Sequence, residues 1–167
     1  NAQAVANEDQ IIVSADVTDQ ANDSQQAQPM VEQALENLDD VGVNDKIKAF
    51  TADAGYFSDS NATSLEENDR IDESYVATGR TKHHERIPDA PKGRPPKDLT
   101  AKEKMARKLR TKKGRAEYAR RKAIIEPIFG HIKHCRGFRQ FLLRGLSNMQ
   151  AEWKLVCLTH NLLKLFR

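Results

Sequence analysis

Residues 118–133, with the sequence YARRKAIIEPIFGHIK, constrain the fold more than any other part of the chain. At 3.6 residues per turn, Ile125, Phe129 and Ile132 fall on one face of a helix. A single acid, Glu126, falls on the adjoining face among several cations. The spacing therefore predicts a helix that packs one side against a core and presents an acid and cations on the other.

Two interpretations of Glu126 remain open at this point. A carboxylate above a basic surface can hold a divalent metal ion while the cations bind phosphates. Alternatively, Glu126 forms an ordinary i,i+4 ion pair with Lys122. In both cases Pro127, which lacks an N–H and crowds residue 123, is expected to end or kink the helix.

The composition limits the class of protein. A chain of 167 residues can bury one core, and a mean hydropathy of −0.72 with 31% charged residues indicates a water-soluble chain. No apolar run approaches the roughly 20 residues of a membrane span, so no membrane partner is expected. Cys135 and Cys157 provide no disulfide framework, which favours a reducing cytoplasm. The chain opens on Asn1 and its first methionine is Met30, which indicates a piece of a longer product.

Charge is distributed unevenly along the chain. Residues 1–78 hold 17 acidic and three basic residues, a net charge of −14, whereas residues 79–167 hold seven acidic and 24 basic residues, a net charge of +17. A basic half of this strength favours a polyanionic partner such as nucleic acid. The alternative is that the two halves attract each other.

The acidic part, residues 1–78, is predicted to run β-β-α-β-α-β, beginning with an antiparallel hairpin. Asn22 to Ser24 are expected to cap the first helix. A strand over residues 47–52 delivers Asp53 to its C-terminal end, where α/β folds place their chemistry. The alternative role for Asp53 is to cap the turn that follows, in which Gly55 is expected to take a positive φ.

Residues 79–99 are rich in glycine, proline and cations and are predicted to form a mobile basic loop. Residues 100–167 are predicted to be basic and helical. Thr100 and Glu103 form a capping box that starts a helix. Cations surround that helix, so it is expected to be poorly amphipathic and to lean on a partner, with Gly114 as an interruption.

The last helix is expected to open with a second capping box, Ser147 with Gln150. Its core-facing stripe is predicted to contain Met149, Trp153, Val156, Cys157, His160 and Leu163, and the preceding turn region is anchored by Phe138 and Phe141. The remaining histidines and cysteine, His83, His84, His131, His134 and Cys135, match no strong zinc signature, so zinc is not expected.

Several of these segments together resemble one protein family. They are residues 51–58 (TADAGYFS), 75–80 (YVATGR), 124–133 (IIEPIFGHIK) and 137–141 (GFRQF). The family is the DDE-type transposases of bacterial insertion sequences. The resemblance implies an α/β, ribonuclease-H-like mixed sheet flanked by helices, with strand order 3-2-1-4-5.

The resemblance also implies an activity and its cofactors. Asp53 and Glu126 would be catalytic and would ligate two Mg²⁺ or Mn²⁺ ions for DNA cleavage and strand transfer at transposon ends. The family's first aspartate and first strand would precede Asn1, so the chain is expected to lack its central strand and to be inactive alone. The alternative is a non-catalytic DNA-binding remnant of a transposase.

The family's tyrosine-basic-glutamate-lysine signature is similar to Tyr118, Arg121 or Lys122, Glu126 and Lys133. Lys122, not Arg121, stands four residues before Glu126, so the basic member is left open between the two. The tyrosine and the basic residues of the signature, Tyr118, Arg121, Lys122 and Lys133, are expected to contact DNA phosphates, together with Arg136 and Arg139. The implied partners are transposon-end and target DNA and further copies of the same protein, in the bacterial cytoplasm.

Overall fold

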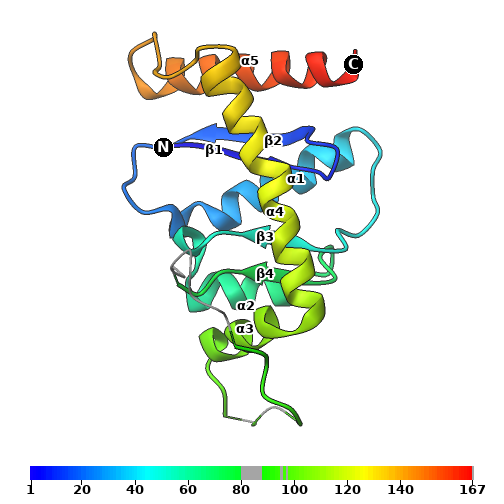
Figure 1. Ribbon diagram of the computed structural model, residues 1–167. Helices are drawn as coiled ribbons and strands as arrows, with labels where there is room; N and C mark the ends of the chain where they lie inside the picture. Colours follow the sequence, from blue (N-terminus) through cyan, green and yellow to red (C-terminus); the bar gives the residue numbers. More distant parts are fainter. Residues whose placement is uncertain (80–87, 95, 97, 167) are drawn as a thin grey trace. The chain divides into compact units, whose positions relative to one another are not determined.

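The computed structural model describes residues 1–79, 88–94, 96 and 98–166. These residues contain the predicted β-β-α-β-α-β order, followed by a helical part (Figure 1). The chain is therefore α/β. The elements are β1 (Ala2–Ala6), β2 (Ile12–Val17), the 3₁₀ turn η1 (Asp23–Gln25), α1 (Ala27–Asp40), β3 (Phe50–Ala52), the 3₁₀ turn η2 (Ala54–Tyr56), α2 (Asp59–Glu67), β4 (Ser74–Val76), α3 (Ala101–Arg110), α4 (Lys112–Gly130), the π-helix η3 (His131–Cys135) and α5 (Leu146–Leu165).

The chain forms two compact units, each with its own small sheet. The first unit comprises Asn1–Ala21, Pro29–Asn44 and Lys122–Arg167, and the second comprises Asn22–Gln28 and Asp45–Arg121. In the first unit β1 pairs antiparallel with β2, which confirms the predicted hairpin. In the second unit β3 pairs parallel with β4. None of the helices in the described ranges has the length and apolar character needed to cross a bilayer.

The core of the first unit lies between the hairpin and α5, and α1 lies on the other side of the hairpin (Figure 1). Trp153 is 2% exposed and donates from Nε1 to the Gln3 carbonyl at 2.8 Å. Phe138 stacks on Trp153 and meets Phe141 edge to face, so the predicted aromatic anchors are confirmed. The buried core residues are Ile12, Ala15, Val17, Ile128, Ile132, Trp153, Val156 and Cys157.

The predicted stripe of α5 is largely confirmed, but its predicted cap is wrong. Trp153 and His160 are buried as expected, whereas Leu163 is 42% exposed. The helix begins at Leu146 with Gly145 as N-cap, and no side chain caps it. Gly145 has a φ of 85°, which a glycine adopts freely and which places the chain to enter the helix without a serine cap.

The helix that carries Glu126 does not end at Pro127. α4 continues to Gly130, and η3 follows it directly. Gln10 Nε2 donates to the Ala123 carbonyl at 2.9 Å, the acceptor that Pro127 leaves without its helical N–H. The predicted apolar stripe is confirmed: Ile125 and Phe129 of α4 pack against the core, and Ile132 of η3 is 1% exposed.

In the second unit, β4 and α3 form the centre of the packing. Tyr75 and Val76 are each 1% exposed, and Met105 of α3 is fully buried and accepts from the Val76 N–H at Sδ. The prediction of poor amphipathicity, made for the basic region from Lys102 to Lys122, is wrong for α3, whose inner face carries the fully buried Met105. The predicted capping box of Thr100 and Glu103 is confirmed.

The basic helical region is interrupted at Thr111, between α3 and α4, and not at Gly114. Thr111 Oγ1 accepts from the Gly114 N–H at 2.9 Å. A Cβ on Gly114 would lie 2.1 Å from the Lys108 carbonyl oxygen. Gly114 is therefore required for the close approach of the two helices, not for a break.

Part of the predicted mobile loop, residues 79–99, lies outside the described residues, as does Arg80. The segment that is described runs along α3. Arg107 donates to the carbonyls of Pro91 and Gly93 at 2.8 and 2.6 Å, and Arg115 pairs with Asp89 at 2.6 Å. Two cations of the basic region are thus used to hold this segment.

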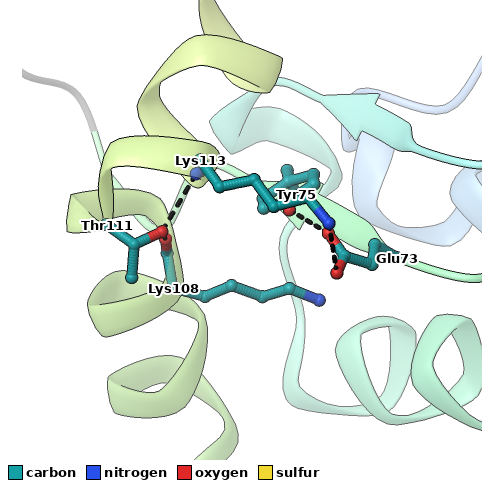
Figure 2. A network of polar contacts seen from close by, with 6 residues as sticks. Glu73, Tyr75, Lys108, Thr111 and Lys113 are labelled. Carbon is teal, nitrogen blue, oxygen red and sulfur yellow. Dashed lines mark hydrogen bonds and ion pairs between the residues drawn. The ribbon is translucent and has the colours of Figure 1, made fainter.

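A polar network joins β4 to the start of α4 (Figure 2). Glu73 accepts from Lys113 Nζ at 2.8 Å and from the Tyr75 hydroxyl. The hydrogen bond from Lys113 and then that from Tyr75 hold the pKa of Glu73 below its ordinary value. Lys108 Nζ lies 4.9 Å from the centroid of the Tyr75 ring. Lys113 and Lys108 therefore also form contacts within the second unit.

Candidate functional site

Asp53 lies directly after β3, at the C-terminal end of the strand as predicted. It is exposed and caps η2, with Oδ1 accepting from the Gly55 N–H at 2.9 Å. The capping role considered from the sequence is therefore real. Because capping uses Oδ1, and no described residue bonds Oδ2, one carboxylate oxygen of Asp53 is available for a ligand.

Gly55 does not take the positive φ expected of it. It forms part of η2, and what matters at this position is that glycine has no side chain. A Cβ at Gly55 would lie 3.2 Å from Oδ2 of Asp23 and 3.2 Å from Oδ1 of Asp53. The missing side chain thus lets two carboxylates approach the same point.

Asp23 is the residue that sequence reasoning placed only in a helix cap. It belongs to η1, where Asn22 Oδ1 accepts from the Ser24 N–H at 3.1 Å. The structure brings Asp23 close to Asp53 across Gly55. No motif in the sequence links η1 with η2, so only the fold could reveal this pair.

The charges of both aspartates affect the pKa of Tyr56. Burial chiefly raises the pKa of its phenol, and Asp23 and Asp53 raise it further. The carboxylates of Asp23 and Asp53 both lie near this ring, so this part of the second unit carries negative charge. Negative charge there favours a cation near Asp53.

Glu126 lies exposed on α4 in the first unit. No described residue forms a hydrogen bond or an ion pair with it, so the i,i+4 pair with Lys122 is not formed. The ordinary ion-pair interpretation therefore has no support from the structure. The Glu126 carboxylate is free to bind a ligand.

The cations near Glu126 in the sequence differ in their surroundings. Lys122 and Arg139 are exposed, and Lys133 Nζ lies 5.4 Å from the centroid of the Phe129 ring. Arg136 is half-buried and donates to the Val156 carbonyl at 2.8 Å and to the Thr159 hydroxyl. Of these four, Arg136 is the one whose guanidinium is already engaged within the fold.

Tyr118 and Arg121 lie on the part of α4 that belongs to the second unit. The Arg121 guanidinium carbon lies 5.5 Å from the centroid of the Tyr118 ring. Arg121 Nε is buried without a hydrogen-bond partner. The pair forms a stacked cation and ring.

Asp53 and Glu126 belong to different units, and their convergence stays a prediction. Within the described ranges, no three or more His, Cys, Asp or Glu side chains are grouped so that they could hold a metal ion. His83 and His84 lie outside the described residues. His131 and His160 meet edge to face at 5.6 Å between ring centroids.

Comparison with known protein families gives a match. Residues 95–166 match the family described as "Transposase DDE domain". No curated protein and no solved structure matches the chain. The matched range includes Tyr118, Glu126 and Lys133. The resemblance to DDE-type transposases is therefore confirmed, and residues 95–166 carry it.

Proposed function

We propose that this chain is part of a transposase that cleaves DNA phosphodiester bonds at transposon ends and joins the freed ends to target DNA. The observation that carries the proposal is the transposase DDE domain match over residues 95–166, which contains Glu126. Glu126 is an exposed carboxylate that forms no ion pair with any described residue, and exposed cations lie near it in the sequence. That is the surface that a metal-dependent reaction on a polyanion requires.

The catalytic groups in this proposal are Asp53 and Glu126, which would ligate Mg²⁺ or Mn²⁺, with two ions expected. Their oxygen donors suit these hard cations. Oδ2 of Asp53 is bonded by no described residue, and the neighbouring Asp23 adds negative charge close to it. A bound divalent ion would supply Lewis-acid activation of water and then of the 3′-hydroxyl.

The cations and the tyrosine of the signature would hold the DNA backbone. Lys122, Lys133 and Arg139 are exposed and suited to phosphate contacts. Tyr118 and Arg121 would act as a stacked pair. Arg136 would contribute its remaining donors, because two are already bonded to α5.

The fold in this proposal is ribonuclease-H-like. If the proposed missing strand is counted as the first, β2 and β1 would correspond to the pair 3-2, and β3 and β4 to the pair 4-5. These are the outer pairs of the expected order 3-2-1-4-5. The proposed central strand, with the first aspartate, would lie outside this chain, so weak or absent activity is expected of the chain alone. The active form would be a homo-oligomer in the bacterial cytoplasm.

A non-catalytic DNA-binding remnant is the second candidate. It is favoured by one observation, that no three acidic or metal-binding side chains group together in the part that the structure describes. Binding without chemistry needs only the cations.

The test uses the full-length product that contains this chain, with transposon-end DNA and Mg²⁺ or Mn²⁺. The transposase proposal expects metal-dependent nicking that Asp53→Asn and Glu126→Gln each abolish while DNA affinity is kept. Glu66→Gln, an exposed acid on α2, is the matched control and should cleave normally. Binding without cleavage in every protein would instead support the remnant.

A further inference from the structure

The turn between β1 and β2 contains an unusual backbone conformation. Gln10 has a φ of 63°, and no other non-glycine residue in the described ranges has a positive φ. Side-chain-bearing residues adopt this conformation at a free-energy cost, and turns of this kind usually place glycine or asparagine there. Such an outlier is explained when the residue makes contacts that offset its cost.

Gln10 makes contacts to two helices of the first unit. Its Nε2 donates to the Ala123 carbonyl of α4 at 2.9 Å. Its Oε1 accepts from Lys164 Nζ of α5 at 3.1 Å, and its main-chain carbonyl lies 3.1 Å from His160 Nε2. The hairpin turn is thus tied to both helices through one residue.

The contact with Lys164 decides which way the Gln10 amide faces. A lysine ammonium only donates hydrogen bonds, so the amide oxygen must face Lys164. The amide nitrogen must then face Ala123, as observed. Lys164 therefore keeps the donor of Gln10 aimed at α4.

The Ala123 carbonyl is the acceptor that an ordinary residue at position 127 would serve with its N–H. Pro127 has no N–H, and the Gln10 amide occupies that place. The contact spans the turn of α4 that bears Glu126. It replaces the hydrogen bond that would otherwise hold this turn.

We propose that Gln10 is a positioning residue for Glu126: its side-chain amide substitutes for the missing N–H of Pro127 and fixes the turn of α4 on which the acid lies. The catalytic meaning of this role rests on the proposed function, in which Glu126 ligates the metal. The hold on α4 itself is independent of that function.

A double-mutant cycle tests the proposal in the full-length product. Gln10→Gly removes the amide and relieves the positive φ but keeps the main-chain carbonyl near His160. Pro127→Ala returns an N–H to α4, so the Gln10 amide becomes dispensable. Gln140→Gly, at an exposed position with no hydrogen bond recorded in the described residues, is the matched control.

The first readout is amide hydrogen exchange over residues 128–131. Gln10→Gly should speed this exchange about fivefold or more, since one net hydrogen bond is lost. The double variant should return to the exchange rate of Pro127→Ala alone. The proposal is overturned if Gln10→Gly leaves the exchange rate unchanged, or if the effect of Gln10→Gly is as large in the Pro127→Ala background.

The second readout is metal-dependent cleavage of transposon-end DNA. Gln10→Gly should lower kcat while KM for DNA is kept, and Pro127→Ala should restore kcat in the double variant. An equal loss of kcat with and without Pro127→Ala would refute the positioning role. If the unaltered protein never cleaves, the proposed function fails, and the exchange cycle still decides whether Gln10 holds the helix turn.

Discussion

The side chain of Asn161 on α5 pairs with both main-chain groups of Ile12 on β2. Nδ2 donates to the Ile12 carbonyl and Oδ1 accepts from the Ile12 N–H, each at 2.8 Å. A side chain on a helix thus forms the two hydrogen bonds that a neighbouring strand would otherwise form with Ile12. Asn161→Ala removes both bonds, so we expect a loss of about 2 kcal/mol in the free energy of unfolding.

Denaturation with urea measures this loss. Asn148→Ala is the control, because Asn148 lies exposed at the start of the same helix and, among the described residues, its side chain bonds only the Arg144 carbonyl. We expect it to change stability by no more than about 0.5 kcal/mol. Equal effects from the two variants would show that the Ile12 contacts contribute nothing special.

The two glycines of α4 should respond oppositely to alanine. A Cβ at Gly114 would lie 2.1 Å from a main-chain oxygen that cannot swing aside, so Gly114→Ala should destabilise the protein by about 3 kcal/mol or more. Nothing lies within 4 Å of a Cβ at Gly130, and Gly130→Ala should stabilise the helix by up to about 1 kcal/mol. Thermal melts of both variants check the signs, and a stabilising Gly114→Ala would contradict the tight junction.

The elements that sequence reasoning predicted correctly depend on local patterns. Alternating apolar residues specify the β1–β2 hairpin, and Thr100 with Glu103 specify a capping box within one turn. The features that it missed depend on residues far apart in the chain. Pro127 is tolerated because of Gln10, and the fully buried side chain of Met105 seats a helix that looked uniformly basic.

The candidate site shows the same division. The placement of Asp53 after a strand follows from local pattern, and so does the exposure of Glu126 beside an apolar stripe. The approach of Asp23 to Asp53 could not be predicted, because it depends on η1 and η2 packing together around Gly55. No sequence pattern indicates that Asp23 and Asp53 lie close together.

The two thiols should differ greatly in reactivity. Cys135 is exposed, whereas Cys157 is 4% exposed and burial raises the pKa of its thiol to about 12. A disulfide reagent near neutral pH should therefore label one thiol of the folded protein rapidly and the second only when the first unit opens. Cys135→Ser should remove the fast reaction, and two fast thiols in the native protein would contradict the buried position of Cys157.

The stability of the first unit should fall on mild acidification because of His160. This side chain is 3% exposed, and burial is the main cause that lowers its pKa. The hydrogen bond to the Gln10 carbonyl opposes the shift, and the neighbouring His131, Arg136 and Lys164 add to it. Protonation would place a charge in the core among other cations.

The direction of this pH dependence follows from how the folded and unfolded chains bind a proton at His160. The unfolded chain takes up a proton at His160 near pH 6.5, and the folded chain does so only at lower pH. The free energy of unfolding should thus be highest above about pH 6.5 and fall as the pH drops below it, by at most about 1.4 kcal/mol per pH unit for one proton. Urea denaturation between about pH 8 and pH 5 measures this slope.

His160→Gln is the matched variant, because its amide can still donate to the Gln10 carbonyl but carries no titrating group. It should flatten the pH dependence of stability over this range. His134→Gln, at an exposed histidine, should leave the slope unchanged. A slope that survives His160→Gln would show that His160 is not the cause of the pH dependence.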